Sequence, residues 1–359
     1  VKYITVHDHH LIAAGGEDNL NTVFFSVYND PDDFVGANGA GAVTISDQIQ
    51  GVKGFRADLI VFAKNSIHKL VEINTPANTR IDPIAENVGC LSGYSIQEIG
   101  GDLVFLAPDG IRTVAGTARI GDTELSSISR QIQNVITNIA GSVNSFVVDS
   151  CVLRSKSQYR LFYSGAGASP STAKGVIGTF TGQGFEWSET TGIQAFGLSS
   201  TIDYLGVEKV FHGDKDGYVY NHDTGNSFLL EGSETNILAT YETPDLDFGD
   251  VGTRKSLKYV RTSLSPEGEV VPIIRIRYDY KDSDVPQPAD ITLTGIPLPA
   301  LFGTSTFNSA TFGGSSDPMV RTTLTGSGNT VSIRIRTDDK NLSYGVNGFY
   351  FDYMPSGRR

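Results

Sequence analysis

Cysteine and tryptophan are scarce in this chain of 359 residues, which has two cysteines and one tryptophan. Cys90 and Cys151 lie far apart among apolar neighbours, and neither belongs to a CxxC motif or a Cys/His cluster. We therefore expect two small buried side chains rather than a disulfide framework or a zinc site. The lone Trp187 also argues against a sugar-binding repeat, because such repeats present exposed aromatic rings at equivalent positions.

Long hydrophobic runs and an excess of basic residues are missing as well. No apolar run reaches the roughly 18 residues of a membrane span, and no basic segment followed by an apolar one opens the chain. The sequence predicts neither a membrane span nor a recognisable export signal. The formal net charge of −12 argues against a sequence-reading nucleic-acid binder, which normally carries a basic stripe.

The chain is rich in glycine and in aromatic strand formers, with 40 Gly, 19 Phe and 15 Tyr. Five apolar hairpins recur, starting near residues 10, 57, 101, 157 and 208. Two of them, ADLIVFAKNSIHKLVEI and GDLVFLAPDGIRTVAG, share an Asp-Leu start, a short apolar strand, a polar turn and a second strand. The spacing is close to the roughly 40 to 50 residues of a propeller blade. We predict an all-β fold in which residues 1–230 form a β-propeller of about five to six blades.

The stretch VFHGDKDGYVYNHDTG raises the question of a calcium loop. Aligned on the glycine of the loop template, it places Asp214 and Asp216 at the third and fifth positions. His212 then stands at the first position and Asp223 at the twelfth, where the template needs an acidic residue and a glutamate. An Asp-Gly turn between two strands explains the same letters. We interpret the stretch as a hairpin turn, and we expect neither a metal nor a cofactor.

One segment, between the third and fourth hairpins, breaks the strand pattern. Its apolar residues recur at spacings of three and four, which is typical of one apolar helical face. We predict a single amphipathic helix near residues 123–140, capped by Asp122 or Thr123 and ended by Gly141. Its apolar face either packs on the propeller itself or binds a partner, and the sequence leaves both open.

Residues 231–359 have longer alternating stretches, such as VVPIIRIRYDY and TVSIRIRTDD. Alternation of Ile and Arg predicts strands with one dry and one wet face. Joined by Pro- and Gly-rich links, these strands predict a second antiparallel domain, a sandwich-like tube or platform, whose boundary lies near HDTGNSFLLEGSETN. The wet face is either a solvated sheet face or a partner-binding patch, and it carries Arg275, Arg277, Arg334 and Arg336.

Catalytic motifs are also scarce, since no GxSxG, HExxH or phosphate-loop motif occurs. The His-rich stretch VHDHH has no second cluster of metal ligands. Propellers that hydrolyse glycosides use two carboxylates, and the candidates here occupy equivalent repeat positions: Asp58, Asp102, Asp109 and Asp216. Equivalent positions favour a turn-stabilising role over the two unlike environments that acid-base chemistry needs. We expect a protein that is not an enzyme, with a carbohydrate-binding or glycoside-hydrolysing propeller as the alternative.

Several stretches, in order along the chain, resemble one known family. They are VHDHHLIAAGGEDNLNTVFFSVYNDPDDF (6–34), ISDQIQGVKGFRADLIVFAKNSIHKL (45–70), VGCLSGYSIQEIGGDLVFLAPDGIRTV (88–114), ISRQI (128–132) and FDYMPSGRR (351–359). Together they look like the tail nozzle proteins of short-tailed bacteriophages. This head-to-tail connector family is also called packaged-DNA stabilisation or tail tubular B-like proteins. Each motif is short, but the set spans nearly the whole chain.

The resemblance implies a structural virion protein, made in the host cytoplasm and located in the tail. It implies a homohexameric ring that extends the DNA channel below the portal and an adaptor protein. Such a ring retains the packaged genome and supports attachment of a tail fibre or spike. Double-stranded DNA would pass through it without sequence-specific binding, and a net acidic chain suits this role because a negative lining repels phosphates.

The stretch LFGTSTFNSATFGGSSDP departs from the family. It spaces Phe302, Phe307 and Phe312 five residues apart among Gly, Ser and Thr. Such rings either dock on a neighbouring subunit or pin the loop to its own domain. Together with Arg358 and Arg359 of the terminal motif, these phenylalanines are the candidate interface residues for ring assembly.

Overall fold

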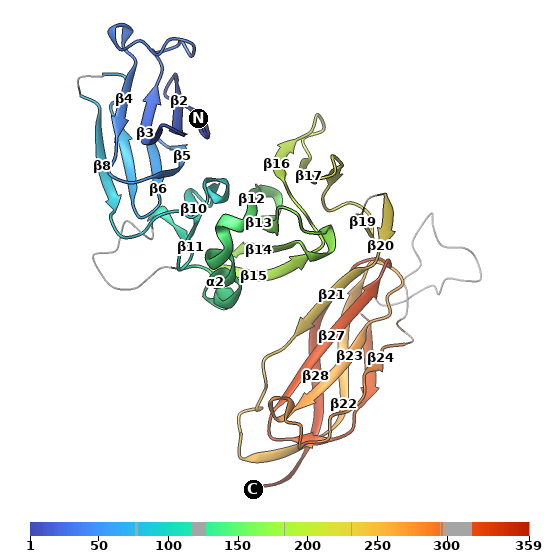
Figure 1. Ribbon diagram of the computed structural model, residues 1–359. Helices are drawn as coiled ribbons and strands as arrows, with labels where there is room; N and C mark the ends of the chain where they lie inside the picture. Colours follow the sequence, from blue (N-terminus) through green and yellow to red (C-terminus); the bar gives the residue numbers. More distant parts are fainter. Residues whose placement is uncertain are drawn as a thin grey trace. The chain divides into compact units, whose positions relative to one another are not determined.

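The computed structural model describes residues 1–75, 78–115, 127–182, 184–230, 232–294, 296 and 318–358. The chain divides into an N-terminal unit, Val1–Asp223, and a C-terminal unit, Thr224–Arg359; the sequence prediction placed the boundary between 230 and 231. Both units are built of antiparallel strands (Figure 1), which confirms the all-β prediction. No helix in the described part of the chain is long and apolar enough to cross a membrane.

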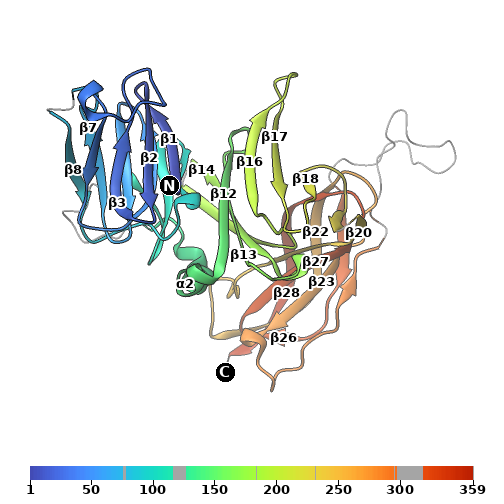
Figure 2. The same ribbon diagram turned by 45° about the horizontal axis from the view of Figure 1, so that its top comes forward.

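Five small sheets follow one another along the described N-terminal unit, and each is an up-and-down meander of three or four strands. Meanders of this kind are the blades of β-propellers, and every predicted hairpin is a neighbouring strand pair inside one of them. The first sheet comprises β1 (Tyr3–His7), β2 (His10–Gly16), β3 (Asn19–Phe25) and β4 (Gly41–Thr44), and the second β5 (Ile49–Phe55), β6 (Asp58–Ala63), β7 (Ile67–Val71) and β8 (Arg80–Ala85). The third comprises β9 (Gln97–Ile99), β10 (Asp102–Ala107) and β11 (Gly110–Thr113), the fourth β12 (Phe146–Leu153), β13 (Gln158–Gly165), β14 (Lys174–Thr181) and β15 (Gly184–Thr191), and the fifth β16 (Gly197–Ile202), β17 (Glu208–Gly213) and β18 (Val219–Asn221). Figure 2 shows β16 and β17 as a hairpin.

Neighbouring sheets of the N-terminal unit share apolar clusters, which explains the apolar runs in their central strands. In β6, Leu59 and Val61 pack in a cluster with the first sheet, whereas Ile60 and Phe62 pack in a cluster with the third. Successive side chains of a strand point to opposite faces, so a strand covered on both faces has no polar alternation. Full burial of each such side chain stabilises the fold by about 1.5–3 kcal/mol.

A single α-helix, α2 (Gln133–Ser142), lies in the described part of the chain, and it packs Ile136 and Ile139 into the cluster between the third and fourth sheets. It starts later than the predicted 123–140, and Gly141 lies inside it rather than at its end. The preceding residues pair with β11 instead: the backbone N–H of Ile128 donates to the carbonyl oxygen of Ile111 (2.9 Å). The predicted caps Asp122 and Thr123 lie outside the described residues. Short 3-10 turns occur at η1 (Gly36–Asn38), η2 (Gly93–Ser95), η3 (Arg130–Ile132), η4 (Val143–Ser145), η5 (Arg154–Lys156), η6 (Pro170–Thr172) and η7 (Asp279–Lys281).

The C-terminal unit is a β-sandwich of two antiparallel sheets that share one apolar core. The β27 sheet has the order β21 (Ile237–Glu242), β27 (Val331–Asp339), β23 (Ile273–Tyr278) and β24 (Ile291–Thr292). In the β22 sheet, β22 (Thr253–Pro266) pairs with β28 (Tyr344–Arg358) on one side and with β25 (Met319–Thr323) and β26 (Ser327–Gly328) on the other. A separate pair, β19 (Phe228–Leu230) and β20 (Ser233–Thr235), precedes the sandwich.

Buried hydrogen bonds also join neighbouring sheets of the N-terminal unit. The hydroxyl of Tyr159, on β13, donates to the carbonyl oxygen of Ser95 ahead of the third sheet (2.8 Å). The Ser150 hydroxyl, on β12, donates to the carbonyl oxygen of Tyr94 (2.6 Å). A buried acceptor that loses its donor raises the free energy of the folded state, so these bonds specify which sheets meet.

We expect Tyr159→Phe to lower the free energy of unfolding by about 1–3 kcal/mol, because it leaves the buried Ser95 carbonyl without this donor. The same change at Tyr204, which is 94% exposed, is the matched control and should have no effect beyond about 0.5 kcal/mol. Fluorescence of Trp187, the single tryptophan, reports urea unfolding of the N-terminal unit. Equal midpoints for the two variants would show that the bond contributes nothing.

Candidate functional site

The predicted arginine face lies on the β27 sheet of the sandwich. In the register of β23 and β27, Arg275 stands opposite Arg334, and Ile273 stands opposite Arg336. The alternate residues Ile274 and Ile276 are buried in the core. All four predicted arginines therefore share the outer face, as the Ile-Arg alternation predicts.

Carboxylates already neutralise most of this face. Arg275 pairs with Asp290, and Arg336 lies 3.7 Å from Asp338. The carboxylate of Glu242, on β21, forms ion pairs with both Arg334 (2.7 Å) and Lys281 (2.8 Å). Burial by itself raises the pKa of Glu242, but the hydrogen bonds and charges of these two cations outweigh it and lower the pKa. Half-exposed pairs of this kind contribute at most about 1 kcal/mol each, which fits a solvated face better than a dedicated anion site.

Arg277 differs from the other three arginines. Its Nε is buried and has no hydrogen-bond partner among the described residues. Its strand neighbour across the sheet is Ser332, which offers no charge. A buried Nε is not accessible to a partner, so this atom is an unsatisfied group of the sheet rather than a binding position.

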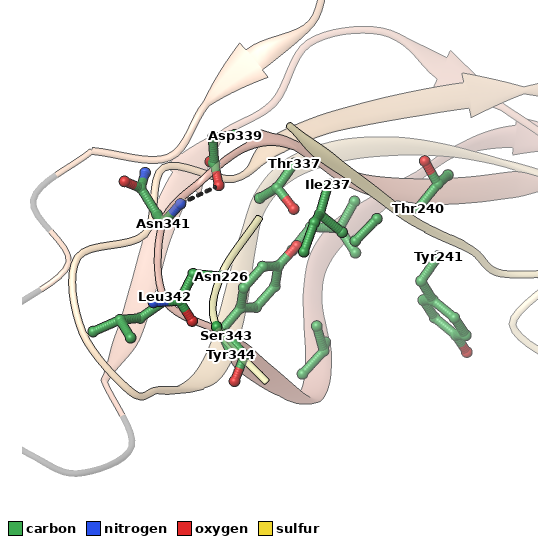
Figure 3. Close-up of a pocket in the computed structure, with 14 residues that line it drawn as sticks. Asn226, Ile237, Thr240, Tyr241, Thr337, Asp339, Asn341, Leu342, Ser343 and Tyr344 are labelled. Carbon is green, nitrogen blue, oxygen red and sulfur yellow. Dashed lines mark hydrogen bonds between the residues drawn. The ribbon is translucent and has the colours of Figure 1, made fainter. Parts of the chain in front are cut away.

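A pocket that the sequence pattern does not reveal lies at the other side of the β27 sheet, between β21 and β28. Its volume is about 310 Å³, and Ile237, Ala239, Ile335 and Val346 supply apolar walls. Figure 3 shows the ring of Tyr344 reaching across it toward Ile237 and Thr337. Burial raises the pKa of the Tyr344 hydroxyl, and a hydrogen bond with Thr337 opposes that shift. The pocket is a concave, mainly apolar surface with a polar rim.

The candidate carboxylates for glycoside hydrolysis are dispersed and engaged in local contacts. Asp58 begins β6 in the second sheet, whereas Asp102 begins β10 in the third. Asp102 accepts backbone N–H bonds from Leu103 and Ala115, and Asp109 pairs with the buried Arg112. Asp216, in the fifth sheet, pairs with Lys215. Asp102, Asp109 and Asp216 are thus each engaged in a contact close by in the chain, which fits the predicted turn-stabilising role.

The Asp-Gly stretch of the fifth sheet is a hairpin turn between β17 and β18. Asp214 accepts the backbone N–H groups of Asp216 and Tyr218 (both 2.9 Å) and the Tyr220 hydroxyl (3.0 Å). Gly217 has a φ of 88°, which favours glycine there. Across the described ranges, no group of three or more His, Cys, Asp or Glu side chains is arranged to hold a metal ion.

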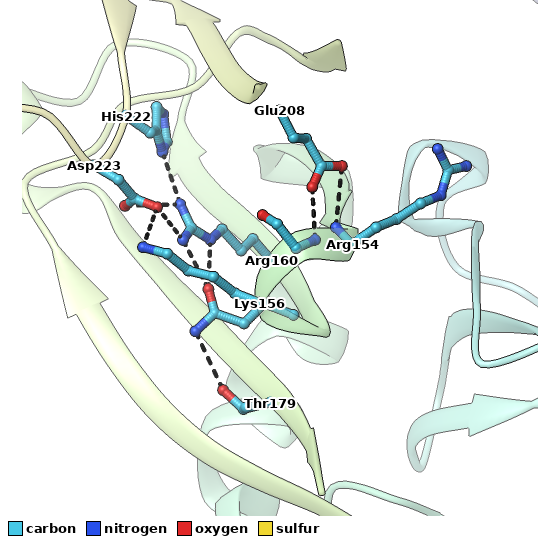
Figure 4. A network of polar contacts seen from close by, with 9 residues as sticks. Arg154, Lys156, Arg160, Thr179, Glu208, His222 and Asp223 are labelled. Carbon is cyan, nitrogen blue, oxygen red and sulfur yellow. Dashed lines mark hydrogen bonds and ion pairs between the residues drawn. The ribbon is translucent and has the colours of Figure 1, made fainter. Parts of the chain in front are cut away.

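A polar network joins the fifth sheet to the fourth, and sequence reasoning missed it (Figure 4). Arg160, on β13, donates to both carboxylate oxygens of Asp223 and lies 3.5 Å from Nδ1 of His222. Because a guanidinium only donates, His222 Nδ1 must be unprotonated. His222 then carries its proton on Nε2 and donates it to Nδ1 of His212 (2.7 Å). Both imidazoles are therefore neutral in this arrangement.

The titration behaviour of these groups agrees with the geometry. Burial lowers the pKa of His212 to about 4. Burial, together with the neighbouring His212 and Arg160, lowers the pKa of His222 to about 4. For Asp223, burial raises the pKa, but the bonds from Arg160 and Lys156 outweigh it and bring it to about 2. The network is a fixed structural contact at neutral pH.

We expect His212 and His222 to lower the stability of the N-terminal unit as the pH falls from about 6.5 to about 4, while Asp149, whose pKa burial raises to about 6, acts in the opposite direction. Folded His212 and His222 have pKa values below that of an unfolded histidine, so the unfolded chain binds more protons in this window. The loss is at most roughly 3 kcal/mol per histidine. Trp187 fluorescence in urea between pH 8 and pH 4.5 measures it.

Substituting His222→Gln should flatten this pH dependence, since it removes one of the two protonation sites. The matched control is His9→Gln, at an exposed histidine of the same unit, which should leave the pH dependence as it is. An unchanged slope in His222→Gln would show that the network does not couple stability to pH.

The predicted interface residues fall largely outside the described part of the chain. Phe302, Phe307, Phe312 and Arg359 are not among the described residues. Arg358 is the last residue of β28, where its backbone stands opposite Thr253 of β22. Their role in ring assembly therefore remains a prediction.

Comparison with known proteins gives little further information. No protein-family model matches this chain, and no curated protein matches it. Among solved structures, the N-terminal domain of Nup159 is similar over 62% of this chain and 60% of its own, with a TM-score of 0.36 and 9% identity. An exo-β-1,3-galactanase from Phanerochaete chrysosporium, solved with galactose, is similar over 96% of this chain and 65% of its own, with a TM-score of 0.22 and 9% identity. At such low scores these likenesses carry no functional argument.

Proposed function

We propose that this chain is a structural subunit of a bacteriophage tail, a ring-forming nozzle that extends the DNA channel below the portal. In this proposal six copies form the ring, an adaptor protein holds it, and a tail fibre or spike attaches to it. The ring retains the packaged genome until ejection. Its role is mechanical and needs no catalytic residue or cofactor.

The observation that carries the proposal is the ordered resemblance, whose motifs coincide with structural units. Residues 6–34 cover the main hairpin of the first sheet, 45–70 the first three strands of the second, and 88–114 all of the third. The terminal motif, up to Arg358, is the second half of β28, an edge strand of the sandwich. The motifs thus fall on strands of the first three sheets and on a sandwich edge, and the third of them covers a whole sheet.

The charge distribution is compatible with a DNA conduit. The net charge is −12, and the positive side chains of the arginine face are mostly paired with carboxylates. Phosphate-binding surfaces need free cations, because affinity for DNA comes from neutralised phosphates. A channel wall without free cations would let the DNA slide past without binding.

Electron microscopy of phage particles that carry this protein tests the proposal. A gold-labelled antibody against the chain should mark the tail below the portal, and rotational averages of that level should show a six-fold ring. The purified chain should also form particles of about six times its 38.6 kDa mass. An antibody against the capsid protein is the control, because it must label the head alone.

Two results would contradict the proposal. One is a label that is absent from the particles and present in a secreted fraction. The other is a chain that releases sugars from a polysaccharide, with loss of that activity in Asp102→Asn. The second result would favour the carbohydrate-active alternative.

A further inference from the structure

The two sheets of the sandwich are unequal, and this leaves one strand uncovered. The β27 sheet is four strands wide, whereas the described β22 sheet is three wide, because β25 and β26 share one side of β22. In β27, Ile333 and Ile335 are almost fully buried. In the adjacent edge strand β21, Ala239 is exposed and Tyr241 is 55% exposed, although both lie on the inner, core-facing side. Among the described residues, the β22 sheet therefore has no strand opposite β21.

The vacant position has a free backbone edge beside it. In the described structure β28 pairs with β22 alone, so its other edge has no strand partner over 15 residues. Neighbouring strands lie about 4.8 Å apart and stacked sheets about 10 Å. A strand added to this edge of β28 would thus lie over β21. The 310 Å³ pocket marks where its inward side chains would go (Figure 3).

We propose that this groove accepts a β-strand from a second copy of the chain, and that residues 301–312 of that copy supply it. Main-chain bonds to β28 would give affinity, and alternate side chains would fill the pocket over Ile237 and Ala239. This inference rests on the proposed function, because it names the contact between neighbouring copies in the proposed ring.

The choice of donor segment rests on its sequence and on the described strands before and after it. Residues 297–317 lie outside the described structure, and 297–316 carry no charge. The run LFGTSTFNSATF combines Phe and Thr, which favour strands, and contains no Pro. The largest apolar side chains in it are the three Phe rings, which match an apolar pocket.

The two described strands that flank the donor segment lie on the side of the sandwich opposite the groove. The donor segment lies between β24 and β25 along the chain. β24 is the edge of its sheet away from β21, and β25 pairs with the side of β22 away from β28. A copy that gives a strand on one side and accepts one on the other makes head-to-tail contacts, which close into a ring when the rotation allows it.

Complementation between two variants tests this exchange. Ala239→Arg places a charge on the groove floor and leaves the donor intact; Leu238→Arg, on the outer face of the same strand and 56% exposed, is the matched control. The triple variant Phe302→Ser, Phe307→Ser and Phe312→Ser disables the donor and leaves the groove intact. Light scattering after gel filtration gives the mass of each, and circular dichroism checks that each is folded.

We expect the wild type and Leu238→Arg to assemble and each disabled variant to remain near 38.6 kDa. A mixture of the two disabled variants should form pairs of about twice that mass and nothing larger, because each pair has one working donor and one working groove. A wild type that stays monomeric, disabled variants that assemble like the wild type, or a folded mixture that fails to pair would overturn the inference.

Cysteine trapping provides a second measurement that does not depend on the disabled variants. Ala239→Cys and Phe307→Cys, made in separate chains, should form an interchain disulfide on mixing under oxidising conditions, while the native Cys90 and Cys151 are buried. A disulfide within one chain carrying both changes, at monomer mass, would mean that the chain fills its own groove and would overturn exchange. A six-fold ring that assembles in every groove variant would leave the proposed function standing and remove this contact from it.

Discussion

The N-terminal unit depends on sheets that are apolar on both faces. A central strand with the sequence LIVFA or LVFLA has apolar side chains on both faces of its sheet. Such a sheet is stable only when a neighbouring sheet covers each face. The chain meets this constraint by adding one small sheet after another, each sharing a cluster with the next. The first sheet is covered on one face only. Ile4 and Val6 lie on its other face, away from the shared cluster, and are 66% and 70% exposed.

Apolar stacking alone does not specify which sheets meet, and buried polar groups supply that specificity. Ser95 lies at one such junction: its hydroxyl accepts from the backbone N–H of Leu106 (3.0 Å), and its carbonyl oxygen accepts from Tyr159. At the next junction, Glu208 accepts the N–H groups of Arg154 and Ser155, beside the Arg160 network. Any other pairing of sheets would leave the buried Ser95 carbonyl and the buried Arg160 guanidinium unsatisfied, which is unfavourable in a medium of low dielectric constant.

Features with short-range causes could be predicted from the sequence. Turn residues and period-two alternation are local, so the five hairpins and the outward face of Arg275 and Arg334 follow from the letters alone. The late start of α2 does not, because a strand distant in sequence, β11, takes the preceding residues as its partner. The bond between His212 and His222 could have been found from the hairpin register, which brings both to one end of the β17–β18 pair.

The groove of the sandwich belongs to the features that no local pattern reveals. Ile237 and Val346 are distant in sequence. They line one pocket because β28 is the edge of the described β22 sheet, and no further described strand of that sheet covers β21. Proteins that keep such an edge free usually blunt it with charge, proline or a bulge. The β28 strand has Pro355 and register shifts in its pairing with β22, but it also presents Tyr350 and Met354 to solvent, at 55% and 58% exposure. An edge strand with no described partner on one side is a surface for strand addition, which is the physical basis of the proposed contact between copies.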